Sequence, residues 1–412
     1  MKHHRFSHTL QTAVIAVVAA SFAACAGPGG SPVAGSQAFL TLPRTGGQRQ
    51  TAGLGPVVSS QFGGQIFGWD MNQNGNDGVL TETVLGSSVI NAIETFDEST
   101  GKITKVVQKV QRINANVEPV VDAVAGSDVG IVDVERLIVQ PFERNDYFDL
   151  INPVTGEKIT GRTKPRQILG INPNFVTNNQ ASSSQIMMAV YSNKRGDDVV
   201  GLYTYDTVRN AWGKRVDFPL AFLFQNGFPN YAAIDATTNE AVVGYLGRAR
   251  YNPHESATFY IMDAATGKHL RSFYGVGFGF PNGMAIDSTT DTMCTTTTGD
   301  TDVEFYKLST GKGKAVQIPI YYGKGPLTNG AAVAADPIHH LFLVAQLDST
   351  FSPSGSTVIV YDERGKIVEY INGFDFFPSA SSVVIPHLAV NPSKRTGYVN
   401  GPNPNQLQEF TY

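Results

Sequence analysis

Two phrases that alternate along the chain decide the fold. The first is typified by FYIMDAATGK (259–268), an apolar run that ends in Asp and leads into a Thr-Gly-Lys turn. The second is typified by NGMAID (282–287), an apolar run that ends in Asp. Alternating apolar residues suit one face of a strand, Asp bonds nearby backbone N–H groups to start a turn, and Gly supplies a positive φ. Each phrase therefore predicts a strand followed by a tight turn.

Copies of both phrases recur over most of the sequence. The first phrase occurs at 93–102, 147–158, 202–214, 259–268, 303–312, 358–366 and 406–412. The second, ending in Asp or Asn, occurs at 65–70, 128–133, 167–172, 230–235, 282–287, 331–336 and 386–391. With the strands between them, one unit has roughly 45 to 60 residues and about four strands, the size of a propeller blade. We expect an all-β chain whose residues 59–412 form a single seven-bladed β-propeller, with the second phrase as the innermost strand of each blade.

The end of the last unit makes a further prediction about ring closure. QLQEFTY (406–412) is only the third strand of its blade, and a blade without its fourth strand would leave an edge that favours aggregation. We expect a segment within 36–60, either AFLTL or PVVSS, to supply the missing strand and close the ring.

The repeat resembles that of known bacterial propellers. Phrases such as VIVYDERGK (358–366) and NGMAID (282–287) are similar to the blade repeats of YVTN/YncE-like and NHL-like proteins. The resemblance spans about residues 60–412, and it implies the fold without implying an activity. The chain departs from regular members because its blades differ in length and several lack a Pro after the Asp.

The N-terminus indicates export. A positively charged start is followed by TAVIAVVAASFAA (12–24), which is too short for a membrane span and leads into small residues, as in a signal peptide over 1–25. The phrase FAACAG (22–27) resembles a lipobox, which implies lipidation of Cys25 and a place in the periplasm or outer membrane. Ordinary cleavage and secretion stay open, since Phe22 replaces the usual aliphatic residue. Residues 26–58 are rich in Gly, Ser and Pro and predict a flexible tether.

Charge and cysteine content exclude some classes of function. The net charge is −4 with no basic run, so we expect no nucleic-acid partner. The two cysteines give no disulfide framework if Cys25 is lipidated, and Cys294 lies in a strand-like run, where we expect a small buried side chain. We expect a monomer that meets the membrane through a lipid anchor only.

A candidate ligand site follows from the propeller geometry. The first residues of the second phrase should ring one mouth of the central channel; they are Gln65, Asp128, Gln167, Asn230, Asn282, Asn329 and His387. One interpretation is a ring that holds a ligand through hydrogen bonds. The other is that these groups bond water and the backbone of neighbouring blades.

Loops on the same face add further candidates. Four loops leading to innermost strands are dense in aromatics and Gly: 218–230, 273–283, 321–330 and 371–382. Such loops suit sugars, apolar small molecules or a protein partner, although packing between blades would explain them too. A neighbouring loop carries a cluster in which His next to a carboxylate could do acid–base work, or could simply be solvated: Arg248, Arg250, Tyr251, His254 and Glu255. His339 and His340 should lie in a hairpin turn on the opposite face.

A calcium site is a separate possibility in WDMNQNGNDGVLTE (69–82). Its oxygen-bearing residues are Asp70, Asn72, Asn74 and Asp77. Asp, Asn and Gly also suit a tight hairpin, and the twelfth position of an EF-hand loop would be Thr81 rather than Glu. Asp70 aligns with Asp235 and Asp287, which predicts a hairpin about two residues longer than its counterparts.

The sequence thus favours a binding or scaffold module of the cell envelope that needs no cofactor. Its partner would be a protein, a small molecule or a carbohydrate. The alternative is a metal-dependent hydrolase, because Pro281-Asn282-Gly283 resembles a metal-binding phrase of SMP-30/gluconolactonase propellers. That resemblance implies a divalent cation held by Asn282 and carboxylates of other blades, and Asp128 is the one carboxylate among the ring positions.

Overall fold

The computed structural model gives a chain whose described regular elements are all β-strands. The described residues are 53–72, 75–84, 88–113, 123–125, 130–134, 147–151, 173–178, 184–192, 198–206, 211–212, 216–218, 229–235, 237–245, 258–264, 266, 268–276, 280–298, 302–318, 330–346, 356–374 and 388–412. Within this part of the chain, no helix is long and apolar enough to span a membrane.

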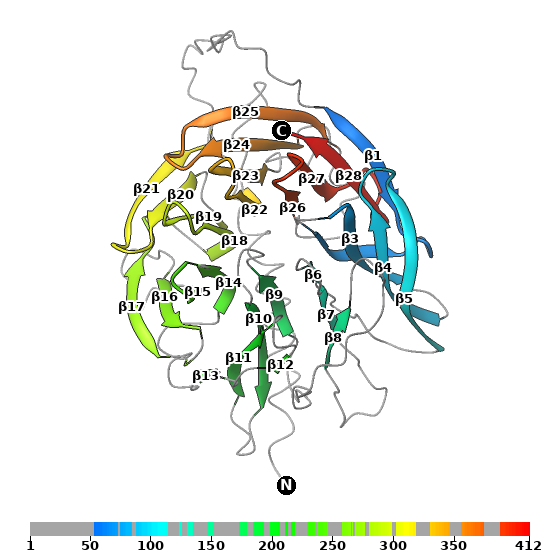
Figure 1. Cartoon of the computed structure of the whole chain (residues 1–412), viewed down its shortest axis with the longest axis horizontal. Coiled ribbons are helices and arrows are strands. Elements are labelled where there is room, and N and C mark those ends of the chain that lie inside the picture. Colours follow the sequence, from blue (N-terminus) through cyan, green and yellow to red (C-terminus); the bar gives the residue numbers. More distant parts are fainter. Residues whose placement is uncertain are drawn as a thin grey trace, which may run out of the picture. The chain divides into compact units, whose positions relative to one another are not determined.

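The described strands form seven sheets, which we number in chain order (Figure 1). Sheets one, four, five and six each have four strands paired in sequence order. Sheet one contains β2 (Gln65–Met71), β3 (Asp77–Val84), β4 (Ser88–Asp97) and β5 (Lys102–Ile113). Sheet four contains β14 (Pro229–Asp235), β15 (Glu240–Tyr245), β16 (Thr258–Asp263) and β17 (His269–Tyr274). Sheet five contains β18 (Phe280–Asp287), β19 (Thr292–Thr298), β20 (Asp302–Lys307) and β21 (Lys312–Gln317). Sheet six contains β22 (Gly330–Asp336), β23 (Leu341–Gln346), β24 (Ser356–Asp362) and β25 (Ile367–Phe374).

The other three sheets vary this plan. Sheet two has three described strands, β6 (Ala123–Ala125), β7 (Gly130–Val134) and β8 (Tyr147–Ile151). In sheet three, β12 and β13 both pair with β11, and its strands are β9 (Pro173–Asn178), β10 (Ser184–Ser192), β11 (Asp198–Asp206), β12 (Ala211–Trp212) and β13 (Val216–Phe218). Sheet seven has the order β1-β28-β27-β26 and consists of β1 (Leu54–Ser59), β26 (Leu388–Asn391), β27 (Thr396–Asn400) and β28 (Gln406–Thr411).

The first sequence phrase falls on the third strand of its sheet in every case, from β4 to β28. The second phrase falls on the first strand in sheets one, four, five, six and seven. Sheet two differs, because the phrase at 128–133 overlaps β7, which lies between β6 and β8. The prediction that this phrase is an innermost strand was therefore wrong; the short first strand β6 carries no Asp-ended phrase that could mark it. The phrase at 167–172 lies outside the described residues, and the first strand of sheet three is β9.

First strands of successive sheets contact one another. β2 contacts β6, β6 contacts β9, and the series continues through β14, β18, β22 and β26 to β2. Figure 1 shows these strands on the inner side of their sheets, with β5, β17, β21 and β25 on the outer side. Buried side chains fill the space between neighbouring sheets. One such cluster joins sheets one and seven through Trp69, Phe96, Tyr398 and Leu407.

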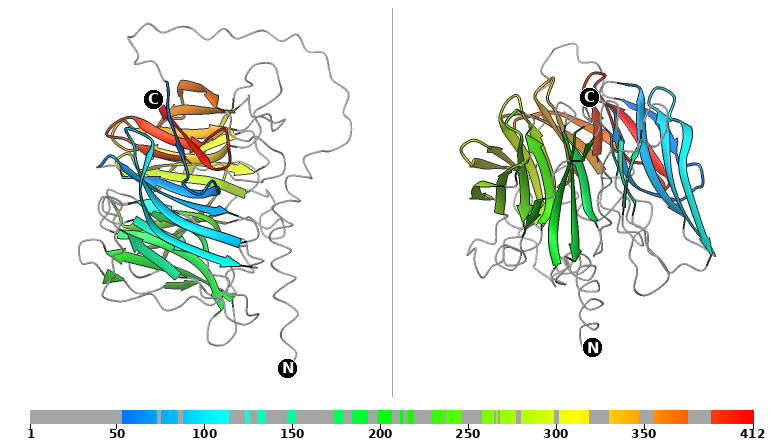
Figure 2. Two further views of the ribbon diagram at one scale, coloured as in Figure 1. Left: turned by 90° about the vertical axis from the view of Figure 1, so that its right-hand side faces the viewer. Right: turned by 60° about the horizontal axis from the view of Figure 1, so that its bottom comes forward.

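The N-terminal strand β1 belongs to the last sheet. β1 pairs with β28 in antiparallel fashion, with Val58 opposite Leu407 and Ser59 opposite Gln406, and Figure 2 shows the blue strand beside the red ones. This is the pairing that we expected for PVVSS. Because β1 begins at Leu54, the strand takes in the last residues of the segment 26–58 that we assigned to the tether.

The hairpins between first and second strands share one geometry. The paired residues Asp235–Glu240, Asp287–Thr292, Asp336–Leu341 and Asn391–Thr396 each enclose four residues. The fourth enclosed residue has a positive φ of 54–56° at Asn239, Asp291, His340 and Arg395. In sheet one the N–H of Asn72 bonds the carbonyl of Asp77, so Asn72 is the counterpart of Asp235. The alignment of Asp70 with Asp235 was wrong, because β2 continues through the fully buried Met71.

Candidate functional site

The predicted mouth residues that the structure describes lie at the starts of first strands. Gln65 begins β2 and pairs with Thr83, Asn230 is the second residue of β14, and Asn282 is the third residue of β18. The predicted positions Asp128, Gln167, Asn329 and His387 lie outside the described residues. So do Cys25 and the face-loop cluster Arg248, Arg250, Tyr251, His254 and Glu255.

A one-residue bulge recurs where these first strands begin. Pro229 pairs with Tyr245 and Tyr231 pairs with Gly244, so Asn230 is the extra residue. The extra residues of the other bulged first strands are Phe67 in β2, Asn174 in β9, Asn282 in β18 and Ala331 in β22. Bulges of this kind redirect side chains and often lie beside binding sites. Asn174 was not predicted as a mouth residue, although it follows a Pro just as Asn230 and Asn282 do.

The opposite ends of the first strands carry the Asp or Asn of the second phrase, and these residues hold the hairpins. Oδ1 of Asp287 accepts the N–H of Thr289 at 3.0 Å, and Oδ1 of Asp336 accepts the N–H of Ile338 at 2.9 Å. Both side chains are fully buried. A short carboxylate that accepts a backbone N–H two residues ahead fixes a tight turn, which explains why the phrase ends in Asp.

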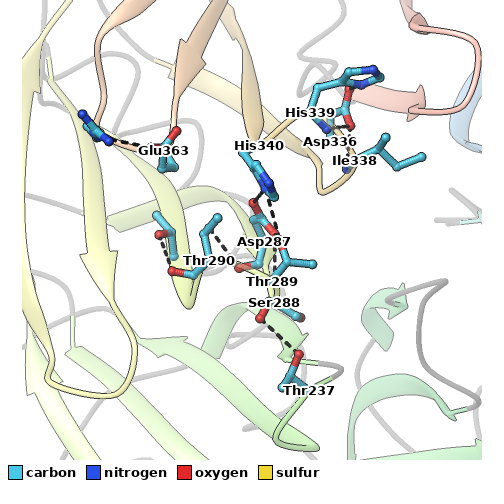
Figure 3. Close-up of polar contacts among 12 residues, drawn as sticks. Thr237, Asp287, Ser288, Thr289, Thr290, Asp336, Ile338, His339, His340 and Glu363 are labelled. Carbon is cyan, nitrogen blue, oxygen red and sulfur yellow. Dashed lines mark hydrogen bonds and ion pairs between the residues drawn. The ribbon is translucent and has the colours of Figure 1, made fainter.

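The same hairpins also bond the next sheet (Figure 3). The hydroxyl of Thr237 donates to the carbonyl of Ser288 at 3.1 Å and so joins sheets four and five. Nδ1 of His340 lies 3.0 Å from Oδ2 of Asp287 and joins sheets five and six. His339 and His340 do lie in the predicted hairpin turn. These bonds give this end of the strands a structural role.

Sheets six and seven, and then seven and one, are joined in a similar way. The hydroxyl of Tyr412 donates to Oδ2 of Asp336 at 3.1 Å. Nδ2 of Asn391 donates to Oε2 of Glu98 at 2.9 Å and to the carbonyl of Asn72 at 3.2 Å. Lys394 forms an ion pair with Oε2 of Glu98 at 2.8 Å. The hairpin of sheet seven thus bonds sheet one at two places, the hairpin that follows β2 and the turn that follows β4.

Two buried carboxyl groups lie where the chain passes from β1 to β2. Glu82 accepts the N–H groups of Phe62 and Gly64 at 3.0 and 2.9 Å, and Glu94 accepts that of Gln61 at 3.1 Å. Burial, with the nearby Glu82 charge as a second cause, raises the pKa of Glu94 to about 8. A raised carboxyl pKa in a cleft can mark an acid catalyst, but these groups bond the backbone of the linking turn and therefore stabilise it.

The candidate calcium hairpin is held by bonds between its own residues and sheet seven. Nδ2 of Asn72 donates to Oδ1 of Asp77 at 3.2 Å, and Asn391 bonds the carbonyls of Asn72 and Gly75. Burial raises the pKa of Asp77. Asn74 lies outside the described residues. This hydrogen bond joins the side chains of Asn72 and Asp77 within the hairpin, and the calcium site stays a prediction.

The described residues offer neither a metal-binding cluster nor an exposed thiol. No group of three or more His, Cys, Asp or Glu side chains in the described ranges is placed to hold a metal ion. Cys294 is free and fully buried, as we expected, and burial raises the pKa of its thiol.

Comparison with known proteins establishes the class of fold. No family model matches the chain, and no curated protein matches it. Among solved structures, the β-propeller domain of Myceliophteria thermophila Cps50 (Swd1) is 9% identical with a TM-score of 0.55, over 88% of this chain and 100% of that chain. The WD40 domain of Neurospora crassa Pan2 is 11% identical with a TM-score of 0.52, over 87% of this chain and 94% of that one. A chain of the mitotic checkpoint complex is 10% identical with a TM-score of 0.50, over 91% and 99% of the two chains.

These likenesses, together with the four-stranded sheets, show that the protein has a β-propeller fold. At such low identity they carry no information about activity. Membership of the YVTN/YncE-like or NHL-like repeats stays a prediction from the repeat phrases.

Proposed function

We propose that the protein is an exported, lipid-anchored propeller of seven blades that binds a protein or small-molecule partner at the mouth where its first strands begin. In this proposal each sheet is one blade, and β1 closes the ring as the outer strand of the last blade. The pairing of β1 with β28 and the unbroken series of contacts among first strands support a closed ring.

The observation that carries the binding function is the contrast between the two ends of the first strands. At the hairpin ends, Asp287, Asp336 and Asn391 are committed to bonds that hold turns and join sheets. At the starting ends, bulges recur with Asn at three of the five bulged positions. A binding face at the bulged end is consistent with both facts.

The similar structures also support a scaffold role. One of the similar chains is part of the mitotic checkpoint complex, so a fold of this kind can take part in a protein assembly. By that analogy, we infer that this chain also binds a protein partner.

Photo-crosslinking in cells tests the binding face. A photoreactive phenylalanine derivative would replace Gln65 at the mouth, and in a matched variant it would replace Ile338, which is 59% exposed on a hairpin. We expect a discrete crosslinked product from position 65 and none from position 338. Equal products at both positions, or none at position 65, would contradict a partner at the mouth.

Radioactive palmitate tests the anchor. The wild-type chain should incorporate the label and remain with the membrane fraction, whereas Cys25→Ser should do neither. A wild-type chain that is cleaved without incorporating label would show ordinary secretion instead.

A further inference from the structure

The outer strand of sheet four carries a stripe of exposed apolar side chains. Leu270 is 41% exposed and Tyr274 63%, both in β17, and Val276, two residues beyond the strand, is 48% exposed. These are three of the six exposed large hydrophobic residues in the described part of the chain. Apolar residues gathered in this way on a protein surface mark a place of contact with another molecule.

The exposed row points away from sheet five. Phe273 packs against Tyr306 of sheet five, with ring centroids 5.2 Å apart. Because alternate residues of a strand point to opposite faces, Ser272 and Tyr274 lie on the other face of β17. On that face the Ser272 hydroxyl lies 2.9 Å from Nε2 of His269. The row therefore contains no Lys, Arg, Asp or Glu.

The backbone of β17 forms the edge of its sheet. Among the described strands β17 pairs with β16 alone, in regular register from Arg271, opposite Ile261, to Tyr274, opposite Thr258. Figure 1 shows β17 on the outer side of sheet four. The N–H and C=O groups on the outer side of such a strand can pair with a strand of another chain.

Three other outer strands carry residues that discourage such pairing. β5 has the exposed Lys102 and Lys105, and β21 has the exposed Lys312 and Lys314. β1 contains Pro56, which has no N–H to donate. Lysines and prolines are common means by which strand edges avoid association. The exposed row of β17 contains neither, so its edge is open to a partner.

The sequence of β17 is complementary to itself in antiparallel pairing. When Ser272 lies on a two-fold axis, Leu270 of one copy is opposite Tyr274 of the other. On the opposite face of the strand, Arg271 is then opposite Phe273. This register keeps every paired residue within β17 and covers both exposed apolar side chains of the strand.

Charge also favours this contact. Arg271 is the one residue among Lys, Arg, Asp and Glu in β17, and its guanidinium donates to the Glu240 carboxylate at 2.9 and 2.6 Å. In the antiparallel pairing each Arg271 faces Phe273 rather than the second Arg271. Like charges directly opposite each other would destabilise a strand pair, and this register has none.

We propose that two copies of the chain associate through β17, with the two strands antiparallel about Ser272. Sheet four of one copy then continues into sheet four of the other. A second copy suits this edge because one strand supplies both halves of the contact, and Leu270 and Tyr274 each meet an apolar partner. A single strand pair buries a small area, so we expect a dissociation constant on the order of 10 µM. The inference does not depend on the proposed binding at the mouth, and it departs from the monomer expected from the sequence.

Sedimentation velocity tests the dimer. The full chain with Cys25→Ser, which removes the proposed acylation site, should pass from monomer to dimer as its concentration rises through the micromolar range. In that background Ser272→Lys places two lysines opposite each other on the axis and should raise the dissociation constant at least about tenfold. Gln317→Lys adds the same charge at the exposed end of β21 and should leave the constant within about twofold. A chain that stays monomeric at every concentration, or a dimer that Ser272→Lys leaves intact, would overturn the proposal.

Disulfide trapping tests the register. In the Cys25→Ser background the one remaining cysteine is Cys294, which is fully buried. Ser272→Cys brings two cysteines directly opposite each other on the axis, within reach of a disulfide, so mild oxidation should give a covalent dimer. Gln317→Cys, on another outer strand, should give none above background. No covalent dimer from Ser272→Cys, or equal amounts from both variants, would refute the contact about Ser272.

Discussion

The ammonium group of Lys394 lies 2.8 Å from Oε2 of Glu98, although the two residues are 296 positions apart in the chain. The Glu98 carboxyl also accepts hydrogen bonds from Asn391 and Thr396, and its backbone carbonyl accepts the hydroxyl of Tyr398. One side chain at the end of β4 is thus bonded by several groups of sheet seven. Glu98 therefore contributes more to the contact between the first and last sheets than any one of its partners in sheet seven does.

Removing Glu98 should therefore cost much more stability than removing Lys394. Glu98→Ala leaves the Lys394 charge and several buried donors unpaired, and we expect a loss of about 3 kcal/mol in the free energy of unfolding. Lys394 is about one-third exposed, so Lys394→Met should cost about 1 kcal/mol. Urea denaturation measures both, and Arg364→Ala, in an exposed ion pair with Glu363, is the control, with an expected change within about 0.5 kcal/mol. Equal losses for Glu98→Ala and Lys394→Met would contradict this ranking.

The buried Glu94 should make stability depend on pH. Its pKa rises from an ordinary 4.5 to about 8 in the folded protein, so the folded state binds this proton more tightly than the unfolded state does. The resulting stabilisation is complete below about pH 4.5 and is lost as the pH rises toward 8. Denaturation at several pH values should show this decline, and Glu94→Gln should flatten it. An unchanged slope in Glu94→Gln would assign the pH dependence to other groups.

The contact between His340 and Asp287 should couple two sheets. Asp287→Ala removes the acceptor for the Thr289 N–H as well as the contact with His340, and we expect it to cost about 2 kcal/mol. A double-mutant cycle with His340→Ala should give a coupling energy of about 0.5–1 kcal/mol. A coupling energy near zero would mean that the hairpins of sheets five and six are stable independently of each other.

Gly78 should be intolerant of even a methyl group. A Cβ added at Gly78 would lie 2.3 Å from the Cζ atom of Phe96. A Cβ added at Gly397 would likewise lie 2.4 Å from the Cζ atom of Phe410. Because Phe96 is fully buried and cannot move away, Gly78→Ala should cost about 2–3 kcal/mol. Adding Phe96→Leu makes room and should restore part of the loss. An unchanged free energy of unfolding in Gly78→Ala would contradict the close packing of β3 against β4.

Calcium should leave the hairpin 72–77 unchanged. Nδ2 of Asn72 donates to the Asp77 carboxylate, and Asn391 fixes the hairpin from outside. We therefore expect equal melting temperatures in millimolar calcium and in excess chelator. A rise with calcium that disappears in Asp77→Asn would instead establish a cation site.

The sequence was informative wherever a residue plays the same local role in each sheet. Asp263 of the first phrase binds the N–H of Thr266 at 2.6 Å, and Gly311 and Gly365, in the Gly turns, have the expected positive φ. Such roles depend on a few adjacent residues, so the third strands and most of the first strands could be located from the phrases. The same logic failed at β7, because its Asp-ended phrase is not on a first strand.

Features that depend on pairing between strands could not be predicted from the sequence. The bulge at Asn230 exists only because Tyr231, and not Asn230, pairs with Gly244. Likewise Asn72 takes the place expected for Asp70 because the hairpin is set by the bond from Asn72 to Asp77. Gln346 is the one polar residue in the strand LFLVAQ (341–346), but its lack of a hydrogen-bond partner in the described part of the chain depends on three-dimensional packing.

The place of β1 in the last sheet also has a consequence for synthesis of the protein. Gly53 bonds Thr411 across 358 positions, so β1 leaves the ribosome long before its partner β28 exists. Until then its edge, with the 38% exposed Val57, has no strand to pair with and could join a neighbouring chain. Completion of the fold must wait for the last residues of sheet seven, and a cell that makes this protein has reason to keep the nascent N-terminal strand shielded.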